Sequence, residues 1–306
     1  MLHKGFIHLL PLLVVSLLVI GGVAVITSQT AVPTEVPSPS LTETSSPTPS
    51  PTPEPTLAPT PIPATAKPTV APTPAPVSGP PSAGHSRYTI GTEVGSFLID
   101  VVSLPAGAEM ITDTANDNDC AGDCPVLPLA DYVSRNGAYA GINGSYFCPT
   151  DYSDCASKKN SFDFPVYNSR LGKWINAGNL FWNGRSMILK NGGLSFLRNA
   201  NSYGGGGSAG IANHPGVLEN GNVIANELGP NSAQQGKGTR GGIGFNGGNI
   251  YLVIARNASV QDLGFIFKAL GATSAMNLDG GGSVALWYGG YKVGPGRALP
   301  NAIVFR

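Results

Sequence analysis

The chain has 306 residues, a formal net charge of zero and only 12% charged residues. Because its Lys and Arg residues are few and form no basic stripe, the composition argues against nucleic acid as a partner. Low charge with many Gly, Asn and Ser residues suits an extracytoplasmic domain that handles neutral polar ligands such as glycans.

An almost unbroken apolar run occupies residues 6–26. As a helix it would be roughly 31 Å long, close to the thickness of a bilayer core. Lys4 precedes the run and no Lys or Arg follows before Lys67, so the positive-inside rule places residues 1–5 in the cytoplasm. We expect a single-pass membrane anchor with the rest of the chain outside the cell. A cleaved signal peptide, which would leave a secreted protein, is the alternative.

Residues 27–85 are dominated by Pro, Thr, Ser and Ala. A segment of this composition has no apolar face to bury, so we expect a disordered, largely polyproline II linker. The remaining residues, 86–306, are numerous enough for a single domain with one buried core.

All four cysteines lie close together in that domain, at Cys120, Cys124, Cys148 and Cys155. An even number of cysteines outside the cell predicts two disulfides. Three pairings are possible, and the simplest joins Cys120 to Cys124 and Cys148 to Cys155. A zinc site is disfavoured because no histidine is near and no second short Cys-x-x-Cys pair exists.

The sequence of the first half of the domain predicts several strands and one helix. Residues 87–104 alternate apolar and polar side chains, which indicates a strand or hairpin, and residues 109–113 indicate another strand. Apolar residues at helical spacing predict a helix over 127–136 that ends at Gly137. A buried strand is expected at 138–142.

An acidic, turn-rich stretch covers residues 113–124. Its Asp-x-Asn-x-Asp pattern is compatible with calcium, but the glycine and final glutamate of an EF-hand loop are missing. We therefore expect a solvated loop there, and neither a metal nor a cofactor in the protein.

Short strands cut by Asn-Gly turns are expected between residues 174 and 245, followed by a strand at 250–255. Ser259 and Asp262 form a capping box at the start of a helix that Gly271 ends. A strand at 275–278 follows. Many short strands with few helices and no regular βαβ alternation predict the α+β class.

The most informative stretch follows that last strand. Asp279 begins a triple-glycine turn formed by Gly280, Gly281 and Gly282, which Ser283 closes. Glycines let a ligand approach the backbone, and successive N–H groups make an anion-binding concavity. Three glycines between Asp and Ser exceed what a hairpin needs, so we interpret this run as a functional loop.

Three further polar residues stand next to apolar strands. Asn143 ends one strand, Arg240 enters another, and Arg297 precedes the last strand at 302–305. Arginine is the side chain best suited to bidentate phosphate contact. Together with Asp279 these residues predict a site for a neutral polar group beside an anion.

The order of these motifs resembles the phosphodiester glycosidase family. The resemblance rests on Asn-Gly-x-Tyr-Phe at 143–147, Arg-x-x-Ile-Gly at 240–244, Leu-Gly-Ala through Asn-Leu-Asp-Gly-Gly-Gly-Ser at 270–283, and Arg-x-x-x-Asn-Ala at 297–302. Gly241 departs from the family pattern, which usually has Thr after the strand arginine. Residues 257–258 also depart from the usual pair before the helix.

The resemblance implies hydrolysis of a sugar-1-phosphodiester in a cell-surface glycan or exopolysaccharide. It implies Asp279, Arg240 and Asn143 as catalytic residues. The implied substrate-binding residues are Gly144, Gly280, Gly281, Gly282, Ser283 and Arg297.

In the expected mechanism Asp279 acts as nucleophile, as base for water or as electrostatic stabiliser. The arginines stabilise the departing phosphate, and Asn143 holds a sugar hydroxyl or acetamido group. No motif identifies a second carboxylate, for which the candidates are Asp113, Asp163, Glu219 and Glu227. His214 is a possible acid or base, although His-Pro-Gly is more typical of a turn.

A non-catalytic surface glycan-binding or wall-scaffolding module of the same fold is the alternative function.

Overall fold

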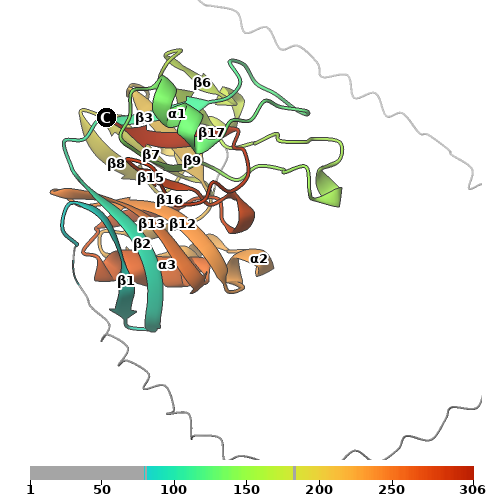
Figure 1. Ribbon diagram of the computed structural model, residues 1–306. Coiled ribbons are helices and arrows are strands. Elements are labelled where there is room, and N and C mark those ends of the chain that lie inside the picture. Colours follow the sequence, from blue (N-terminus) through green and yellow to red (C-terminus); the bar gives the residue numbers. More distant parts are fainter. Residues whose placement is uncertain (1–78, 80, 182–183) are drawn as a thin grey trace, which may run out of the picture. The chain divides into compact units, whose positions relative to one another are not determined.

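The computed structural model describes residue 79, residues 81–181 and residues 184–306 (Figure 1). The expected anchor at 6–26 and most of the expected linker at 27–85 lie outside the described residues. Within the described ranges no helix has both the length and the apolar character needed to cross a membrane.

The described residues form three antiparallel sheets and a few helices, so the expected mixture of many strands with few helices is confirmed. The largest sheet has the order β1-β2-β13-β12-β14-β10-β11. Its strands are β1 (Gly84–Thr92), β2 (Gly95–Pro105), β10 (Gly216–Glu219), β11 (Asn222–Val223), β12 (Gly238–Phe245), β13 (Asn249–Ala258) and β14 (Ser274–Asn277).

The other two sheets have five strands each, in the orders β16-β15-β4-β17-β3 and β6-β5-β9-β7-β8. The first contains β3 (Met110–Thr114), β4 (Ala140–Asn143), β15 (Leu286–Tyr288), β16 (Tyr291–Val293) and β17 (Asn301–Phe305). The second contains β5 (Val166–Asn168), β6 (Lys173–Ile175), β7 (Ser186–Asn191), β8 (Gly193–Leu197) and β9 (Ala209–Asn213).

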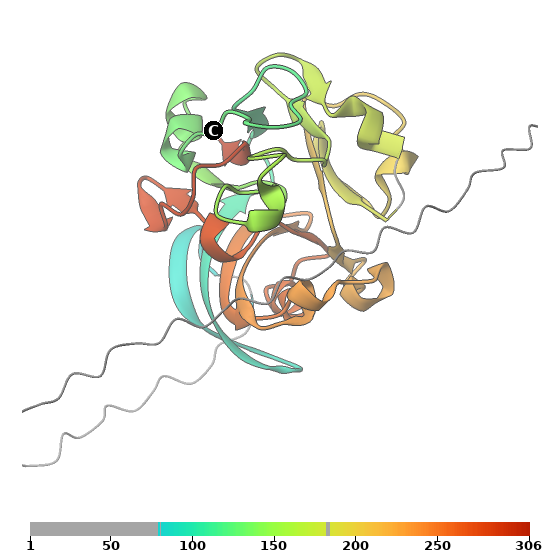
Figure 2. The same cartoon turned by 90° about the vertical axis from the view of Figure 1, so that its right-hand side faces the viewer.

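The described α-helices are α1 (Leu129–Arg135), α2 (Ser232–Gln235) and α3 (Val260–Ala269). Short 3-10 turns are η1 (Ser153–Cys155), η2 (Ala177–Phe181), η3 (Ala200–Ser202), η4 (Ala225–Leu228) and η5 (Gly281–Ser283). The seven-stranded sheet and α3 lie on one side of the domain and the five-stranded sheets on the other (Figure 1, Figure 2).

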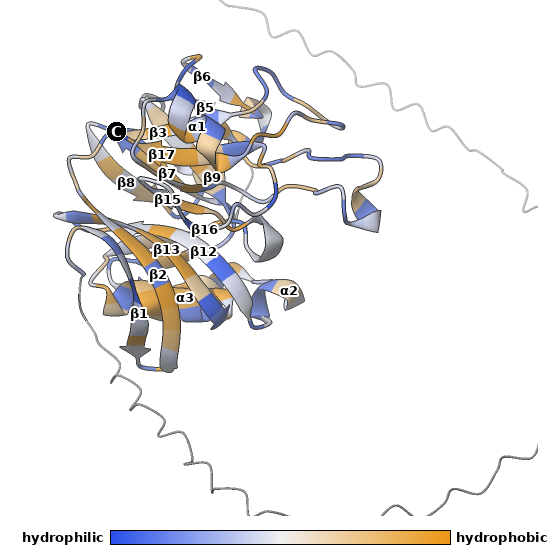
Figure 3. Ribbon diagram, in the orientation of Figure 1, coloured by the Kyte–Doolittle hydropathy of each residue, from blue (hydrophilic) through white to orange (hydrophobic). Residues whose placement is uncertain are grey.

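The main core lies between the large sheet and the two smaller sheets, and a second core lies under α3. Strand β13 borders both cores, because Leu252 and Ile254 face the first while Tyr251 and Val253 face the second. This double burial explains why residues 250–255 of β13 form a continuous apolar run, part of the large sheet whose hydropathy Figure 3 shows. Helix α1 packs on the outer side of β17 and β4.

The capping box that the sequence predicts at α3 is confirmed. The Ser259 side chain accepts a hydrogen bond from the Asp262 backbone N–H at 3.1 Å, and the Asp262 carboxylate accepts one from the Ser259 N–H at 2.6 Å. Gly271, at φ +82°, follows the helix as expected.

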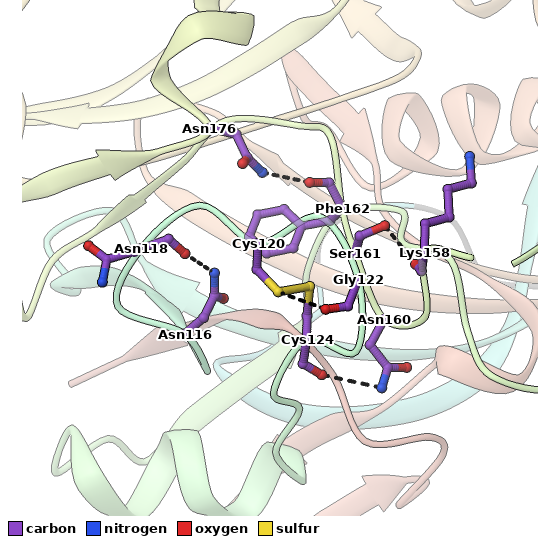
Figure 4. The surroundings of a disulfide bond; sticks show 10 residues. All are labelled: Asn116, Asn118, Cys120, Gly122, Cys124, Lys158, Asn160, Ser161, Phe162 and Asn176. Atoms are coloured by element: carbon purple, nitrogen blue, oxygen red, sulfur yellow. Dashed lines mark hydrogen bonds between the residues drawn. A yellow bond between two sulfur atoms is a disulfide. The ribbon is translucent and has the colours of Figure 1, made fainter. Parts of the chain in front are cut away.

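Both disulfides are present, in the simplest of the three pairings that the sequence leaves open: Cys120–Cys124 and Cys148–Cys155. Hydrogen bonds join Cys124 of the first disulfide to residues 159–160, which follow the loop closed by the second disulfide. The Cys124 N–H donates to the Lys159 carbonyl at 3.0 Å, and the Asn160 side chain donates to the Cys124 carbonyl at 3.3 Å (Figure 4). The segment 148–161 is closed at its base by two further hydrogen bonds, from the Asn160 N–H to the Cys148 carbonyl at 2.6 Å and from the Cys148 N–H to the Ser161 carbonyl at 2.9 Å.

The acidic stretch differs in part from the expected solvated loop. Asp113 belongs to β3, is fully buried, and accepts a hydrogen bond from the Arg135 guanidinium at 2.7 Å. Asp117 pairs with Arg170, and Asp119 accepts from the Asn176 N–H at 2.6 Å. Each of these three carboxylates therefore binds a group in another segment of the chain. No group of metal-ligating side chains is found among the described residues.

Replacing Ser259 with Ala should lower the free energy of unfolding by about 1 kcal/mol, because the Asp262 N–H loses its acceptor at the start of α3. Urea denaturation monitored by circular dichroism measures the change. Ser96→Ala, at an exposed strand position, is the matched control and should stay within about 0.5 kcal/mol of the parent. Equal stability of both variants would contradict a stabilising cap.

Candidate active site

A cleft of about 480 Å³ opens beside the glycine loop. We call it the Asp279 cleft. Its wall is built by the loop after β4, the loop held by Cys148–Cys155, helix α2, the start of β12 and the segments before β15 and β17. Its lining residues are Tyr146, Phe147, Pro149, Tyr152, Phe164, His214, Asn231, Ala233, Gln234, Arg240, Asp279, Gly280, Gly281, Ser283 and Arg297.

Asp279 is the carboxylate of this cleft. Burial raises the pKa of its carboxyl group to about 6. Hydrogen bonds from the Ser283 side chain and the Gly280 N–H oppose this rise, as do the positive charges of Arg297 and Arg240. The Gly280 N–H lies 2.8 Å from the Asp279 Oδ1. The group therefore changes charge within the physiological pH range, which is frequent at functional sites.

The buried side chain of Asn143 holds the glycine loop in place. Its Nδ2 donates to the Asp279 carbonyl at 2.8 Å, and its Oδ1 accepts from the Ala285 N–H at 3.1 Å. The Asp279 N–H in turn donates to the Gly144 carbonyl at 3.0 Å. Both ends of the Asn143 amide are therefore occupied by backbone groups on the two sides of the loop.

Each glycine of the loop has its own reason to lack a side chain. A Cβ at Gly280 would lie 2.9 Å from the Thr239 carbonyl, and one at Gly282 would lie 2.8 Å from the Arg297 guanidinium. Gly281 has a φ of +58° and faces open space. The run thus lets the backbone pass close to two neighbouring groups while it turns.

Arg297 lies across the glycine loop on the opposite wall. Its guanidinium donates to the Ser283 Oγ at 3.3 Å and to the Asp151 carboxylate at 2.5 Å, and it stacks over the Tyr152 ring at 5.2 Å. The hydrogen bond from Arg297 lowers the pKa of the exposed Asp151 carboxyl. Asp151 and Tyr152 both belong to the loop that Cys148–Cys155 closes, so this disulfide holds one edge of the cleft.

Arg240 is held by backbone carbonyls. Its guanidinium donates to Ala258 at 3.2 Å, Ala233 at 2.6 Å and Gly236 at 2.7 Å. No carboxylate of the described residues forms an ion pair with it. The Arg240 guanidinium is therefore held in place in the cleft, and no described carboxylate neutralises its positive charge through an ion pair.

The structure brings most of the expected site residues together. Asp279, Arg240, Gly280, Gly281, Ser283 and Arg297 all line the cleft. Three expected residues do not. Asn143 is fully buried and both ends of its amide are engaged, so the expectation that it holds a sugar group is corrected to support of the loop. Gly144 lies against Asn301, and Gly282 against Arg297.

The candidates for a second carboxylate lie elsewhere. Asp113 is buried in its ion pair with Arg135. Glu219 and Glu227 both pair with Arg198. Asp163 lines a smaller neighbouring cavity of about 160 Å³. Among the described residues that line the cleft, Asp279 is the one carboxylate.

His214 does line the cleft, although the sequence favoured a plain turn there. Its Nδ1 lies 2.7 Å from the Gly184 carbonyl oxygen. Because a carbonyl only accepts, Nδ1 carries a proton, and the Nε2 of a neutral ring is left as a base.

Tyr146 and Gln234 are cleft residues that sequence reasoning missed. Tyr146 stands inside the Asn-Gly-x-Tyr-Phe motif, so its position was visible, but an aromatic residue after a buried strand is as typical of a core. Gln234 comes from α2, a single turn with no apolar periodicity. Only the tertiary fold brings these two side chains to Asp279.

The sequence comparison identifies the family. Residues 136–306, more than half of the chain, match the family model of the phosphodiester glycosidases. The chain belongs to the phosphodiester glycosidase family. The match includes the glycine loop, both arginines of the cleft and the loop after β4. No curated protein has a sequence that matches this chain.

Among the solved structures that match, two illustrate the shared fold. The catalytic domain of zebrafish N-acetylglucosamine-1-phosphodiester alpha-N-acetylglucosaminidase, which is auto-inhibited by its pro-peptide, has 15% identity and a TM-score of 0.53, and the match covers 73% of this chain and 82% of that one. A hypothetical protein from Synechocystis has 17% identity and a TM-score of 0.51, with 72% of this chain and 61% of that chain covered. At these identities the likeness concerns the fold.

Asp279→Asn should stabilise the folded protein at pH 8 by about 1–3 kcal/mol, because burial of the ionised carboxylate is then avoided. A carboxyl group whose folded-state pKa is raised contributes stability that is fully present below its unfolded pKa and lost as pH rises through about 6. The advantage of the variant should therefore shrink between pH 8 and pH 4. Urea denaturation at both pH values measures it, and Asp154→Asn, at an exposed position, is the control. If the difference in unfolding free energy between Asp279→Asn and the parent did not change with pH, the raised pKa of Asp279 would be contradicted.

Proposed function

We propose that this phosphodiester glycosidase-family protein hydrolyses a sugar-1-phosphodiester in an extracytoplasmic glycan. The observation that carries the proposal is the meeting of Asp279, Arg240 and Arg297 in one cleft beside the glycine loop. A carboxylate suits a sugar carbon that becomes positive, and two guanidinium groups suit a phosphate that becomes more negative. The two disulfides support an oxidising compartment outside the cytoplasm.

In the proposed reaction the bond between the anomeric carbon and the phosphate oxygen breaks. The oxygen leaves with the bonding electrons as part of a phosphomonoester, and water supplies the new hydroxyl of the sugar. Because a phosphomonoester is stable as an anion, it needs less protonation than an alcohol would, and Arg240 and Arg297 provide the charge that it requires.

Asp279 stabilises the positive charge of the sugar ring, either through space or by a transient bond to the anomeric carbon. The proton of the attacking water needs an acceptor, and we assign this role to His214, which lines the cleft and whose Nδ1 is engaged with the Gly184 carbonyl. Asn143 acts indirectly in this scheme, since it holds the Asp279 carbonyl and thereby the direction of the carboxylate.

One observation favours the alternative, a glycan-binding module without turnover. Glycosidases generally use two carboxylates, whereas the described lining of the Asp279 cleft contains one. The two functions separate experimentally, because release of sugar from a synthetic sugar-1-phosphodiester is expected of the enzyme alone. No release across several sugars, together with retained glycan binding, would favour the binding module.

Asp279→Ala should lower kcat/KM on a sugar-1-phosphodiester by at least about 10²-fold while the melting temperature stays at or above that of the parent. In the parent, kcat/KM should fall as pH drops below about 6, because the carboxylate then gains a proton. Sugar release followed from pH 4.5 to 8 tests both statements. Turnover that survives the substitution would remove Asp279 from the mechanism.

Arg297→Ala should raise KM and lower kcat, with a loss of about 10–10³-fold in kcat/KM, since a charged contact to phosphate is removed. Arg198→Ala is the matched control, because Arg198 also bridges carboxylates but lies outside the cleft. The control should stay within about twofold of the parent. Equal effects of the two substitutions would show that Arg297 has no special role.

A further inference from the structure

Tyr146 lines the Asp279 cleft, and the charges of Asp279 and Arg240 both act on its hydroxyl group. The residue is fixed in two ways. Its backbone N–H donates to the Asn213 side chain at 3.2 Å, and its ring packs at a tilt against Phe164, with the ring centroids 6.2 Å apart. The hydroxyl group is therefore a fixed element of the cleft wall.

Two side-chain amides donate hydrogen bonds to the Tyr146 oxygen: Asn277 from Nδ2 at 2.6 Å and Gln234 from Nε2 at 3.3 Å. Both amides also donate to the His214 carbonyl, at 3.2 and 3.1 Å. Because a carbonyl oxygen only accepts, it selects the NH₂ end of each amide on this side. The Asn231 N–H, 2.9 Å from the Gln234 Oε1, fixes the second amide further.

The Asn277 side-chain amide has two possible orientations, which differ in the number of hydrogen bonds they make. Its Oδ1 is buried and has no hydrogen-bond partner among the described residues. If the amide were turned over, an oxygen would lie 3.2 Å from the His214 carbonyl oxygen, and the NH₂ group would be the unpaired end. The observed orientation makes two hydrogen bonds where the turned one makes a single bond, so Nδ2 faces Tyr146.

The direction of the Tyr146 proton follows from these contacts. A phenol oxygen accepts hydrogen bonds and carries one proton to donate. Asn277 and Gln234 both donate to this oxygen, and no described residue accepts a hydrogen bond from the hydroxyl group. The proton therefore turns away from the two amides and is available to a ligand in the cleft that Tyr146 lines.

We propose that Tyr146 is a substrate-binding residue whose O–H donates a hydrogen bond to an anionic phosphate oxygen of the ligand, between Arg240 and Asp279. The identity of that ligand as a sugar-1-phosphodiester rests on the proposed function, whereas the donation to a phosphate oxygen rests on the contacts of the hydroxyl group. The bound phosphate thus meets a neutral donor in addition to the arginines.

A neutral donor is suited to this position. Burial raises the pKa of the Tyr146 phenol, and the nearby Asp279 carboxylate raises it further, against the hydrogen bonds from Gln234 and Asn277. The phenol therefore keeps its proton in the physiological range. A cationic side chain here would pair with Asp279, while a phenol leaves that carboxylate free for the sugar.

The test begins with Tyr146→Phe, which keeps the ring and removes the donor. Binding of inorganic phosphate, measured by calorimetry, should weaken at least about tenfold, and kcat/KM on a sugar-1-phosphodiester should fall by a similar factor. Tyr139→Phe, a change at an exposed tyrosine outside the cleft, should leave both quantities within about twofold. Unchanged phosphate binding in Tyr146→Phe overturns the inference, as does a parent protein that does not bind phosphate.

A second replacement covers the case in which Tyr146→Phe does not fold, because two amide groups lose their acceptor in that variant. A ring-fluorinated tyrosine at position 146 keeps the shape and both accepted hydrogen bonds but loses its proton at lower pH. Phosphate binding should then be lost at a lower pH than in the parent. A purely structural tyrosine would leave the pH profile unmoved, which also overturns the inference.

The two proposals can fail separately. Weakened phosphate binding in Tyr146→Phe, in a parent protein that releases no sugar from any sugar-1-phosphodiester, keeps the donor and rejects the hydrolase. Sugar release that is unaffected by both replacements, with unaffected phosphate binding, keeps the hydrolase and rejects the donor.

Discussion

The arrangement of the site depends on the buried amide of Asn143. This amide bridges the Asp279 carbonyl and the Ala285 N–H, one on each side of the glycine loop. Asn143 itself ends β4 in one sheet, whereas Asp279 follows β14 in another. A single side chain therefore ties two sheets together at the point where the cleft opens. In a buried position, loss of either hydrogen bond leaves an unsatisfied backbone group, so this tie is strongly favoured.

The other features of the cleft build on that tie. Once the loop is fixed, Gly280 and Gly282 bring its backbone close to Thr239 and to the Arg297 guanidinium. The carboxylate of Asp279 is then partly buried between two cations, and its raised pKa follows from that burial. The chain's membership of the phosphodiester glycosidase family is shown by the family model, and the glycine loop and both arginines of the cleft lie within the matched residues.

Much of the fold was predictable because local signals agreed with the tertiary structure. The capping box at Ser259, the alternation at 87–104 and the apolar run of β13 each report burial or a helix end directly. The glycine loop was predictable because its composition is unusual. The Tyr146 hydroxyl group, the His214 ring and the Asp151–Arg297 pair were not, because each depends on which loops meet in space. The position of Asn143 at the end of a strand was enough to predict that it belongs to the site. Its burial, which the sequence does not reveal, makes it a support of the glycine loop and not a residue that binds the ligand.

The ion pair between Arg297 and Asp151 has a consequence for selectivity among ligands. The guanidinium is already satisfied by a carboxylate carried on the disulfide-closed loop, so an arriving anion exchanges with an internal competitor. A weak monoanion that reaches Arg297 alone gains little by such an exchange. A ligand that engages Arg240 at the same time has a second contact to offset the displaced carboxylate, and the cleft thereby discriminates in favour of groups that span both walls.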